Sequence, residues 1–360
     1  MRQALALAAL SEGRTSPNPR VGCVVVRDGR AVGTGFHRAC GEPHAETRAL
    51  DAAGELARGA SLFVNLEPCA HFGRTPPCTE RIVAGGIARV VASISDPDPR
   101  VNGLGFRRLR ESGVIVETGA LEDDARRINR SFLQWHETGR PWVVLKAGVS
   151  LDGMLAAQDG RSRWITGEIA RRFAHRLRMR HDAVVVGATT VRRDNPRLTA
   201  RLGGEESARL RVVLSSRADL DPGAAIFDRR DGWPPARVYA ADDAGVDPSL
   251  RGRCELRVVR SRDGRLDIAA VLEDLARDEV QSVLVEGGGT TLASFLSAGL
   301  ADEAALFTAP VLLGARGGTP LLDLASVEDP DRGWRLMNVR RIPLAEDVLV
   351  LGDLRPPGSR

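Results

Sequence analysis

Apolar and polar positions in the first part of the chain alternate between the periods of strands and helices. Short apolar runs typical of buried strands are separated by helical spacing, and Asp28-Gly29 predicts a tight hairpin. This alternation predicts a largely parallel sheet flanked by helices. The predicted strands are 21–27, 31–36, 60–66, 89–94 and 114–117, and the predicted helices are 3–10, 44–53, 78–85, 103–111 and 121–132, with helical sequence continuing to near Glu137.

A second alternating series begins after Gly139-Arg140-Pro141, which interrupts the helical pattern. We therefore predict two α/β domains, residues 1–140 and 141–360, and a chain of 360 residues is long enough for two cores. In the second series the predicted strands are 142–147, 182–187, 210–215, 237–240, 256–260, 282–285, one from 303 onward and 347–351, and the predicted helices are 168–180, 268–277 and one ending at Gly299.

The composition is that of a globular protein, with 43% hydrophobic and 27% charged residues. No apolar run approaches the ~20 residues of a membrane span, and no clear cleavage site follows the N-terminus. Four of the five cysteines lie in the first 80 residues, which suits metal binding better than a disulfide framework. We expect a cytoplasmic protein with no membrane partner.

The charge pattern favours a small substrate over a nucleic acid. The net charge is only +4, the arginines are interspersed with acids, and aromatic residues make up 4% of the chain, which leaves few rings for stacking on bases. Lys146 is the only lysine among 51 basic residues. A single retained lysine suggests a role that needs a compact ammonium group, although it could equally be retained by chance.

One histidine and two cysteines have the spacing of a catalytic zinc site. His44, Cys69 and Cys78 can occupy three corners of a tetrahedron, and the fourth remains for water, whose pKa zinc lowers to about 7. Glu46 lies two residues beyond His44, so it is better placed to transfer protons than to bind the metal. This pattern is typical of the zinc deaminases of nucleobases and nucleosides.

A closed structural zinc site is the alternative interpretation. Cys40 and His71 lie close enough in the sequence to supply a fourth ligand, and the domain would then be a non-catalytic scaffold stabilised by zinc. The presence of Glu46 argues against this alternative.

Two loops carry further candidate residues, each with a structural alternative. Asn18 can point into a pocket, or it can serve as an Asn-Pro turn former. The glycines at 287–289 follow a predicted strand and precede a helix, where bare backbone amides can bind phosphate. A tight turn would need the same residues. Glu286 is either a substrate partner or a solvated acid.

These motifs resemble those of the bifunctional deaminase-reductase of bacterial riboflavin biosynthesis, and the resemblance covers nearly the whole chain. The matching segments are 15–23, 41–46 and 66–78 in the first half and 146–153, 163–166, 194–199 and 285–288 in the second. Eight residues separate Cys69 from Cys78, whereas cytidine and tRNA adenosine deaminases usually have two. The resemblance implies a cytidine-deaminase-like three-layer α/β/α sandwich followed by a dihydrofolate-reductase-like α/β domain.

The resemblance also implies two successive reactions on one phosphorylated pyrimidine. The first is zinc-dependent deamination of a diaminopyrimidinone ribosyl phosphate, in which Glu46 relays the proton. The second is reduction of the ribosyl group to a ribityl chain with NADPH. A homodimer or larger assembly is also expected from the resemblance.

By the same resemblance, the reductase domain would bind NADPH and the substrate through separate residues. NADPH would contact Gly148, Trp164, Thr190, Asp194, Ser216, Gly288, Gly289, Thr290, Thr291, Leu292, Ala293 and Ser294. The phosphorylated substrate would contact Ser162, Arg178, Leu198, Arg201 and Glu286. Two further hypotheses do not depend on the resemblance: Asn18 contacts the substrate at the deaminase site, and Arg217, next to Ser216, pairs with the extra phosphate of NADPH.

The rival enzyme is a deaminase of nucleic-acid bases or nucleosides with a C-terminal binding domain. The cysteine spacing, the few aromatic residues and the reductase-like second half count against it.

Overall fold

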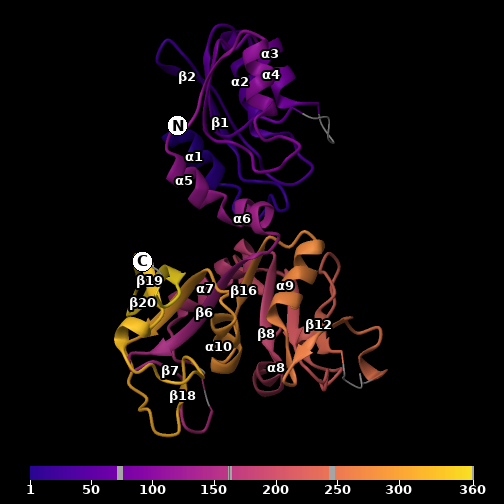
Figure 1. Ribbon diagram of the computed structural model, residues 1–360, viewed down its shortest axis with the longest axis vertical. Helices are drawn as coiled ribbons and strands as arrows, with labels where there is room; N and C mark the ends of the chain where they lie inside the picture. The colour runs from indigo at the N-terminus through magenta and orange to yellow at the C-terminus, as the bar shows by residue number, and fades with distance from the viewer. Residues whose placement is uncertain (71–75, 161, 163, 243–247, 359–360) are drawn as a thin grey trace. The chain divides into compact units, whose positions relative to one another are not determined.

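The computed structural model describes residues 1–70, 76–160, 162, 164–242 and 248–358, and the chain forms two compact units, Met1–Gly139 and Arg140–Arg360 (Figure 1). In both units helices cover a β-sheet, so the predicted α/β class is confirmed. Every helix in the described ranges is too short or too polar to span a lipid bilayer.

Within its described residues, the first unit contains a five-stranded sheet in the order β2-β1-β3-β4-β5. The hairpin predicted at Asp28-Gly29 is confirmed, since β1 pairs antiparallel with β2. The prediction of a largely parallel sheet is wrong at the other side of β1, which pairs antiparallel with β3. β3, β4 and β5 are parallel. The strands are β1 (Gly22–Arg27), β2 (Arg30–Phe36), β3 (Ser61–Leu66), β4 (Arg89–Ile94) and β5 (Ile115–Glu117).

Helices cover both faces of this sheet, which confirms the three-layer sandwich. Ala49, Ile82 and Phe106 pack on one face, from α2 (Ala45–Ala53), α3 (Cys78–Ala84) and α4 (Leu104–Glu111). Leu5, Ala125 and Phe132 pack in a second core, from α1 (Arg2–Ala9), α5 (Glu122–Ile128) and α6 (Arg130–Thr138). The short η1 (Gly54–Ala57) follows α2.

The predicted helix over 121–132 is interrupted at Asn129. The Asn129 side chain accepts a hydrogen bond from the Arg20 amide at 2.8 Å and donates to the Arg20 carbonyl at 3.0 Å. These two hydrogen bonds resemble those between neighbouring strands, and they stabilise the loop before β1. Because the backbone at Asn129 has φ −105° and ψ 17°, one predicted helix becomes two.

Within its described residues, the second unit contains a nine-stranded sheet in the order β13-β12-β11-β8-β16-β6-β17-β20-β19. The strands from β13 to β17 are parallel, and β20 and β19 close the sheet antiparallel. The sheet strands are β6 (Trp142–Ser150), β8 (Ala183–Gly187), β11 (Leu210–Leu214), β12 (Arg237–Ala241), β13 (Glu255–Val259), β16 (Ser282–Val285), β17 (Glu303–Ala309), β19 (Arg335–Leu344) and β20 (Asp347–Arg355).

Helices also cover both faces of the larger sheet. α9 (Ile268–Arg277) and α10 (Gly289–Ser297) pack on one face, and α7 (Glu168–Arg180) and α8 (Ala188–Asp194) pack on the other. The sequence did not predict α8 or β19, and most β19 side chains are at least partly exposed. The short elements are β7 (Met154–Ala156), β9 (Ala200–Leu202), β10 (Glu205–Ser207), β14 (Ser261–Arg262), β15 (Arg265–Leu266), β18 (Thr319–Pro320), η2 (Ala225–Phe227), η3 (Pro248–Leu250) and η4 (Pro330–Arg332).

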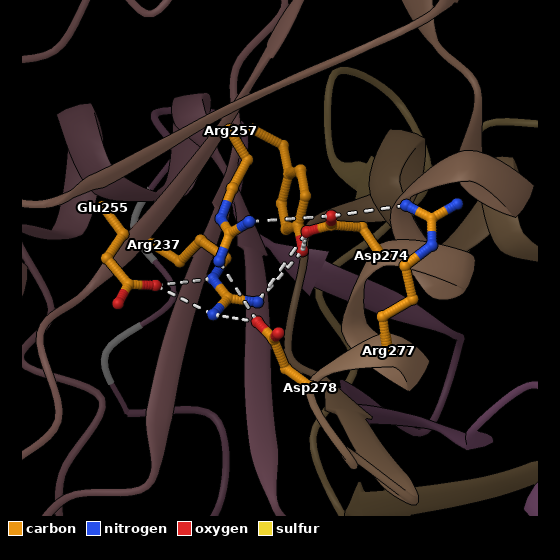
Figure 2. Close-up of polar contacts among 7 residues, drawn as sticks. Arg237, Glu255, Arg257, Asp274, Arg277 and Asp278 are labelled. Carbon is orange, nitrogen blue, oxygen red and sulfur yellow. Dashed lines mark hydrogen bonds and ion pairs between the residues drawn. The ribbon is translucent and has the colours of Figure 1, made fainter.

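A network of charged side chains joins α9 to β12 and to the edge strand β13 (Figure 2). Buried Arg237 contacts Glu255 at 2.8 Å and Asp278 at 2.6 Å. The hydroxyl of Tyr239 donates to Asp274 at 2.8 Å. These partners compensate the burial of a guanidinium group, which would otherwise be costly.

Two glycines of β2 allow α2 to pack directly on the strand backbone. A Cβ atom on Gly33 would lie 2.2 Å from the carbonyl oxygen of Ala49, and one on Gly35 would lie 2.4 Å from that of Ala45. Real side chains cannot occupy such positions, so only glycine permits this approach. The contact fixes the N-terminus of α2 against the sheet.

We expect Gly35→Ala to destabilise the first unit by on the order of 2–3 kcal/mol, because the added methyl group must push α2 away from β2. Thermal unfolding of the variant measures the loss. Thr34→Ala, on the exposed side of the same strand, is the control and should cost less than about 1 kcal/mol. Equal melting temperatures for the two variants would contradict the close-packing explanation.

Candidate functional site

The predicted ligands His44, Cys69 and Cys78 lie together in the first unit. His44 is the N-cap residue of α2, Cys78 is the first residue of α3, and Cys69 follows β3. Their ligand atoms all lie within 4.8 Å of one another. His44 Nδ1 is 3.2 Å from Cys78 Sγ and 3.7 Å from Cys69 Sγ. One nitrogen and two sulfurs this close fit a tetrahedral zinc ion with bonds of about 2.0–2.3 Å.

The electrostatics of the cluster favour a thiolate at Cys69. Hydrogen bonding with the Cys78 side chain, aided by His44, lowers the pKa of Cys69 to about 4. The backbone amide of Cys78 also donates to Cys69 Sγ at 3.3 Å. Hydrogen bonding with Cys69 in turn raises the pKa of His44 to about 9. Metal ions bind thiolates, so these contacts prepare Cys69 as a ligand.

Glu46 lies in the first turn of α2 and is 3% exposed. Burial raises the pKa of its carboxyl group, while the charge of His44 opposes the rise. A carboxyl group with a raised pKa can both accept and return a proton near neutrality. Glu46 is not a member of the ligand cluster formed by the described residues. Its place beside the ligands suits acid–base chemistry.

Asn18 is connected to the metal cluster through His37, which sequence reasoning missed. His37 Nδ1 lies 3.4 Å from the Pro43 carbonyl, which only accepts hydrogen bonds, so Nδ1 carries the proton. The unprotonated Nε2 then accepts from Asn18 Nδ2 at 3.0 Å. This arrangement directs the Asn18 amide group and leaves its Oδ1 to accept from another molecule. The His37 ring also contacts that of His44 edge-on, with centroids 5.4 Å apart.

Glu67 and Asp96 are further polar residues near the cluster that sequence reasoning did not select. Buried Glu67 accepts hydrogen bonds from the backbone amides of Asp96, Gly103 and Phe106, and so holds the loop after β4. Burial raises the pKa of Asp96 to about 7. The sequence feature that could have indicated Glu67 is its position two residues before Cys69, a predicted zinc ligand.

The alternative fourth ligands do not join the cluster within the described residues. Cys40 is exposed and lies outside the group of ligand atoms. His71 falls in the segment 71–75, which lies outside the described residues.

The second unit contains a cavity of about 640 Å³ beside the glycine loop. The loop ends at Gly288, the N-cap residue of α10, so its backbone amides can bind phosphate. A Cβ atom on Gly288 would meet no atom within 4 Å, which leaves room for a ligand. The predicted site residues that line the cavity are Ser162, Thr190, Asp194, Ser216, Glu286, Gly288, Gly289, Thr290 and Thr291. Ser162 and Glu286, which were predicted for the substrate, thus share this cavity with residues that were predicted for the cofactor.

Other predicted residues of the second unit do not line this cavity. Leu292 and Ala293 are buried in α10, and the Ser294 hydroxyl donates to the Thr291 carbonyl. Trp164 is 69% exposed, and the Arg171 guanidinium lies 4.3 Å from its ring centroid. Gly148 (in β6) and the buried Leu198 also lie outside the lining. Their predicted ligand contacts stay predictions.

Three arginines line the cavity, of which sequence reasoning singled out Arg217 and missed Arg192 and Arg193. In an arginine-rich sequence nothing distinguishes these two from the others. Arg192 pairs with Asp219 at 3.1 Å.

Glu286 also joins a cluster of cations. Arg178 donates to both of its carboxylate oxygens, at 2.7 and 2.9 Å, and Lys146 Nζ lies 3.3 Å away. Burial by itself would raise the pKa of Glu286, but the charges of Arg178 and Lys146 hold it well below its ordinary value. Glu286 is therefore a buried carboxylate and not a solvated acid. The retained lysine belongs to this cluster, although the role of its compact ammonium group stays a prediction.

Family models match both units. Residues 141–349 match the RibD C-terminal domain, and residues 1–94 match the cytidine and deoxycytidylate deaminase zinc-binding region. The chain is 43% identical over 317 residues to the riboflavin biosynthesis protein RibD of Bacillus amyloliquefaciens, covering 87% of this chain and 84% of that protein.

Solved structures are similar over nearly the full length. The Acinetobacter baumannii RibD structure has a TM-score of 0.88 at 35% identity, covering 98% of this chain and 97% of that one. A Thermotoga maritima diaminohydroxyphosphoribosylaminopyrimidine deaminase/5-amino-6-(5-phosphoribosylamino)uracil reductase has a TM-score of 0.84 at 35% identity, covering 99% of this chain and 97% of that one.

We expect Cys69→Ala to lose its bound zinc, because two remaining ligands cannot hold the ion through dialysis. Elemental analysis of the dialysed protein measures the metal content. Cys40→Ala is the matched control and should retain one zinc ion per chain. Loss of zinc from the Cys40 variant would instead support the closed four-ligand site.

Proposed function

The chain belongs to the RibD family of bifunctional riboflavin-biosynthesis enzymes, and from this premise we propose that residues 1–140 carry the deaminase and residues 141–360 the reductase. The chain is a deaminase and a reductase, and its cofactors are zinc and NADPH. It deaminates 2,5-diamino-6-(ribosylamino)-4(3H)-pyrimidinone 5'-phosphate and then reduces the ribosyl group, which gives 5-amino-6-(ribitylamino)uracil 5'-phosphate.

The proposed deaminase site consists of His44, Cys69 and Cys78 as zinc ligands, Glu46 as acid and base, and Asn18 as a substrate contact. Zinc held by these three residues would supply a water molecule whose pKa is lowered to about 7. The carboxyl group of Glu46 would accept a proton from this water and return it to the substrate amino group that leaves as ammonia. The Oδ1 atom of Asn18, directed by His37, is available to accept from a pyrimidine amine. The observation that carries this proposal is the three-ligand cluster with a buried carboxyl group beside it.

The proposed reductase site combines the cavity of the second unit with the Glu286 cluster. Gly148, Trp164, Thr190, Asp194, Ser216 and the segment 288–294 would bind NADPH, which would supply the hydride for reduction of the ribosyl group. Ser162, Arg178, Leu198, Arg201 and Glu286 bind the phosphorylated substrate. Arginine suits this task because its charged, planar group can donate two hydrogen bonds to a phosphate.

Further parts of the proposal concern partners and location. The ligands are small molecules, and we propose that the enzyme binds neither nucleic acid nor membranes, acts in the cytoplasm and forms a homodimer or larger assembly. The modest net charge and the few aromatic residues support the absence of nucleic-acid binding.

We expect Glu46→Gln to slow ammonia release by about 10²–10⁴-fold, because the amide cannot exchange the proton. Zinc should remain bound. NADPH consumption should stop when the diamino substrate is supplied and continue when the deaminated compound is supplied.

The control for this experiment is Glu55→Gln, an exposed position outside the site, which should leave both reactions unchanged. Normal ammonia release by Glu46→Gln would remove Glu46 from its proposed role. If Glu46→Gln failed to reduce the deaminated compound, the assignment of the two reactions to separate units would be contradicted.

We expect Arg217→Ala to raise the KM for NADPH by about tenfold or more and to leave that for NADH unchanged, because it removes a charged hydrogen-bond donor from the 2'-phosphate. Steady-state kinetics with both cofactors measure the preference. Arg197→Ala is the control, since Arg197 pairs with Asp228 and does not line the cavity. An unchanged ratio of NADPH to NADH use in Arg217→Ala would rule out this role.

A further inference from the structure

Arg201, on β9 beside α7, forms no salt bridge with a carboxylate among the described residues, although Glu206 lies opposite it on β10. Its exposed guanidinium group has one hydrogen-bond contact in the described structure, from Nη2 to His175 Nε2 at 3.5 Å. Nearby Glu206 is already engaged, because it accepts from the Thr199 hydroxyl at 2.6 Å and pairs with Arg230 at 2.8 Å. The charge of Arg201 is thus available to an anion from solution.

The two contacts of His175 fix its protonation and tautomer. Its Nδ1 lies 3.2 Å from the Thr199 carbonyl oxygen, which only accepts, so Nδ1 must carry a hydrogen. Its Nε2 faces the Arg201 guanidinium, which only donates, so Nε2 must be unprotonated. The neutral Nδ1–H form alone satisfies both neighbours.

The carbonyl group of Thr199 connects His175 to Arg178. Arg178 Nη1 donates to the same oxygen at 2.7 Å, while its Nε and Nη2 atoms bind Glu286. Lys146 shares that single carboxylate. Arg178, Lys146 and Arg201 therefore bring three positive charges against one buried negative charge, and the excess favours an anion at this place.

We propose that His175 is a positioning residue for the phosphate of the reductase substrate: its neutral imidazole holds Arg201 beside Arg178, so that both guanidinium groups contact one phosphate monoester. This inference rests on the proposed assignment of Arg178 and Arg201 to substrate binding. It adds a residue that acts through Arg201 without touching the substrate.

The charges around the imidazole keep it neutral. Burial, then Arg178 on the same helix and Arg201 on β9, lower the pKa of His175 to about 4, against weaker opposing effects of the Thr199 carbonyl and Glu286. The acceptor at Nε2 is therefore present throughout the physiological pH range.

Two near-isosteric variants separate the functions of the two ring nitrogens. His175→Asn keeps an amide near the position of Nδ1 but has no atom at the position of Nε2, whereas His175→Gln can place its amide oxygen there. We expect His175→Asn to raise the KM for the deaminated, phosphorylated substrate by about tenfold, because Arg201 loses its orienting acceptor. The kcat and the KM for NADPH should stay within about twofold, and His175→Gln should restore most of the substrate affinity.

Three controls distinguish positioning from general damage. Arg176→Ala, at an exposed position on the same helix, should leave substrate KM unchanged. With the substrate lacking its phosphate, His175→Asn and the unaltered protein should have equal KM. Adding His175→Asn to Arg201→Ala should cause no further rise in KM, because the histidine acts through Arg201.

The possible failures are distinguishable. If Arg201→Ala raises the KM and His175→Asn does not, the positioning role is wrong and the phosphate assignment stands. If the two substitutions raise the KM independently, the histidine does not act through Arg201, and the inference is again wrong. If neither Arg201→Ala nor Arg178→Ala changes the KM, the phosphate assignment fails and the inference fails with it.

Discussion

The first unit depends on the direct packing of α2 against the backbone of β2. Because Gly33 and Gly35 have no side chains, the helix lies close enough to the sheet for its N-terminus to approach the end of β3 and the start of α3. His44, Cys69 and Cys78 come from three separate elements, and this packing allows one ion to reach all three. The same helix carries Glu46, so the proposed proton-transfer group and one proposed ligand have a common rigid support.

The second unit is organised around the compensation of buried charge. Near the cavity, the carboxylate of Glu286 forms salt bridges with Arg178 and Lys146. At the β13 edge of the sheet, Arg237 forms salt bridges with Glu255 and Asp278. The first cluster has an excess of positive charge, because Arg178, Lys146 and Arg201 lie near the single carboxylate of Glu286. A network in which every charge has a partner, such as that of Arg237, holds structural elements together. A network with an unpaired positive charge can instead bind an anionic ligand.

The sequence predicted the buried helices and strands well, because the spacing of their apolar residues indicates whether one face or the whole element is buried. It did not predict β19, whose side chains are mostly at least partly exposed, or the break at Asn129, which depends on a contact with a residue 109 positions away. The antiparallel placement of β3 beside β1 is also a long-range property that local patterns do not carry.

The candidate site shows the same difference between local and long-range information. The spacing of His44, Cys69 and Cys78 predicted that they lie together, as the structure shows, because a metal restricts the ligand types and their order. His37 and His175 act through other side chains, so no spacing identifies them. Arg192 and Arg193 could not be distinguished in a chain that uses arginine almost throughout, and the cavity itself was needed to select them.

The chain contains a single tyrosine, and it lies within the Arg237 network. Burial, together with the acceptor Asp274, raises the pKa of Tyr239 although Arg237 opposes the rise. Its phenol therefore stays un-ionised in alkaline solutions that would ionise a free tyrosine. If α9 separated from the sheet at alkaline pH, the exposed phenol would ionise and the ultraviolet absorbance of tyrosinate would appear. This absorbance therefore detects opening of the second unit without an added label.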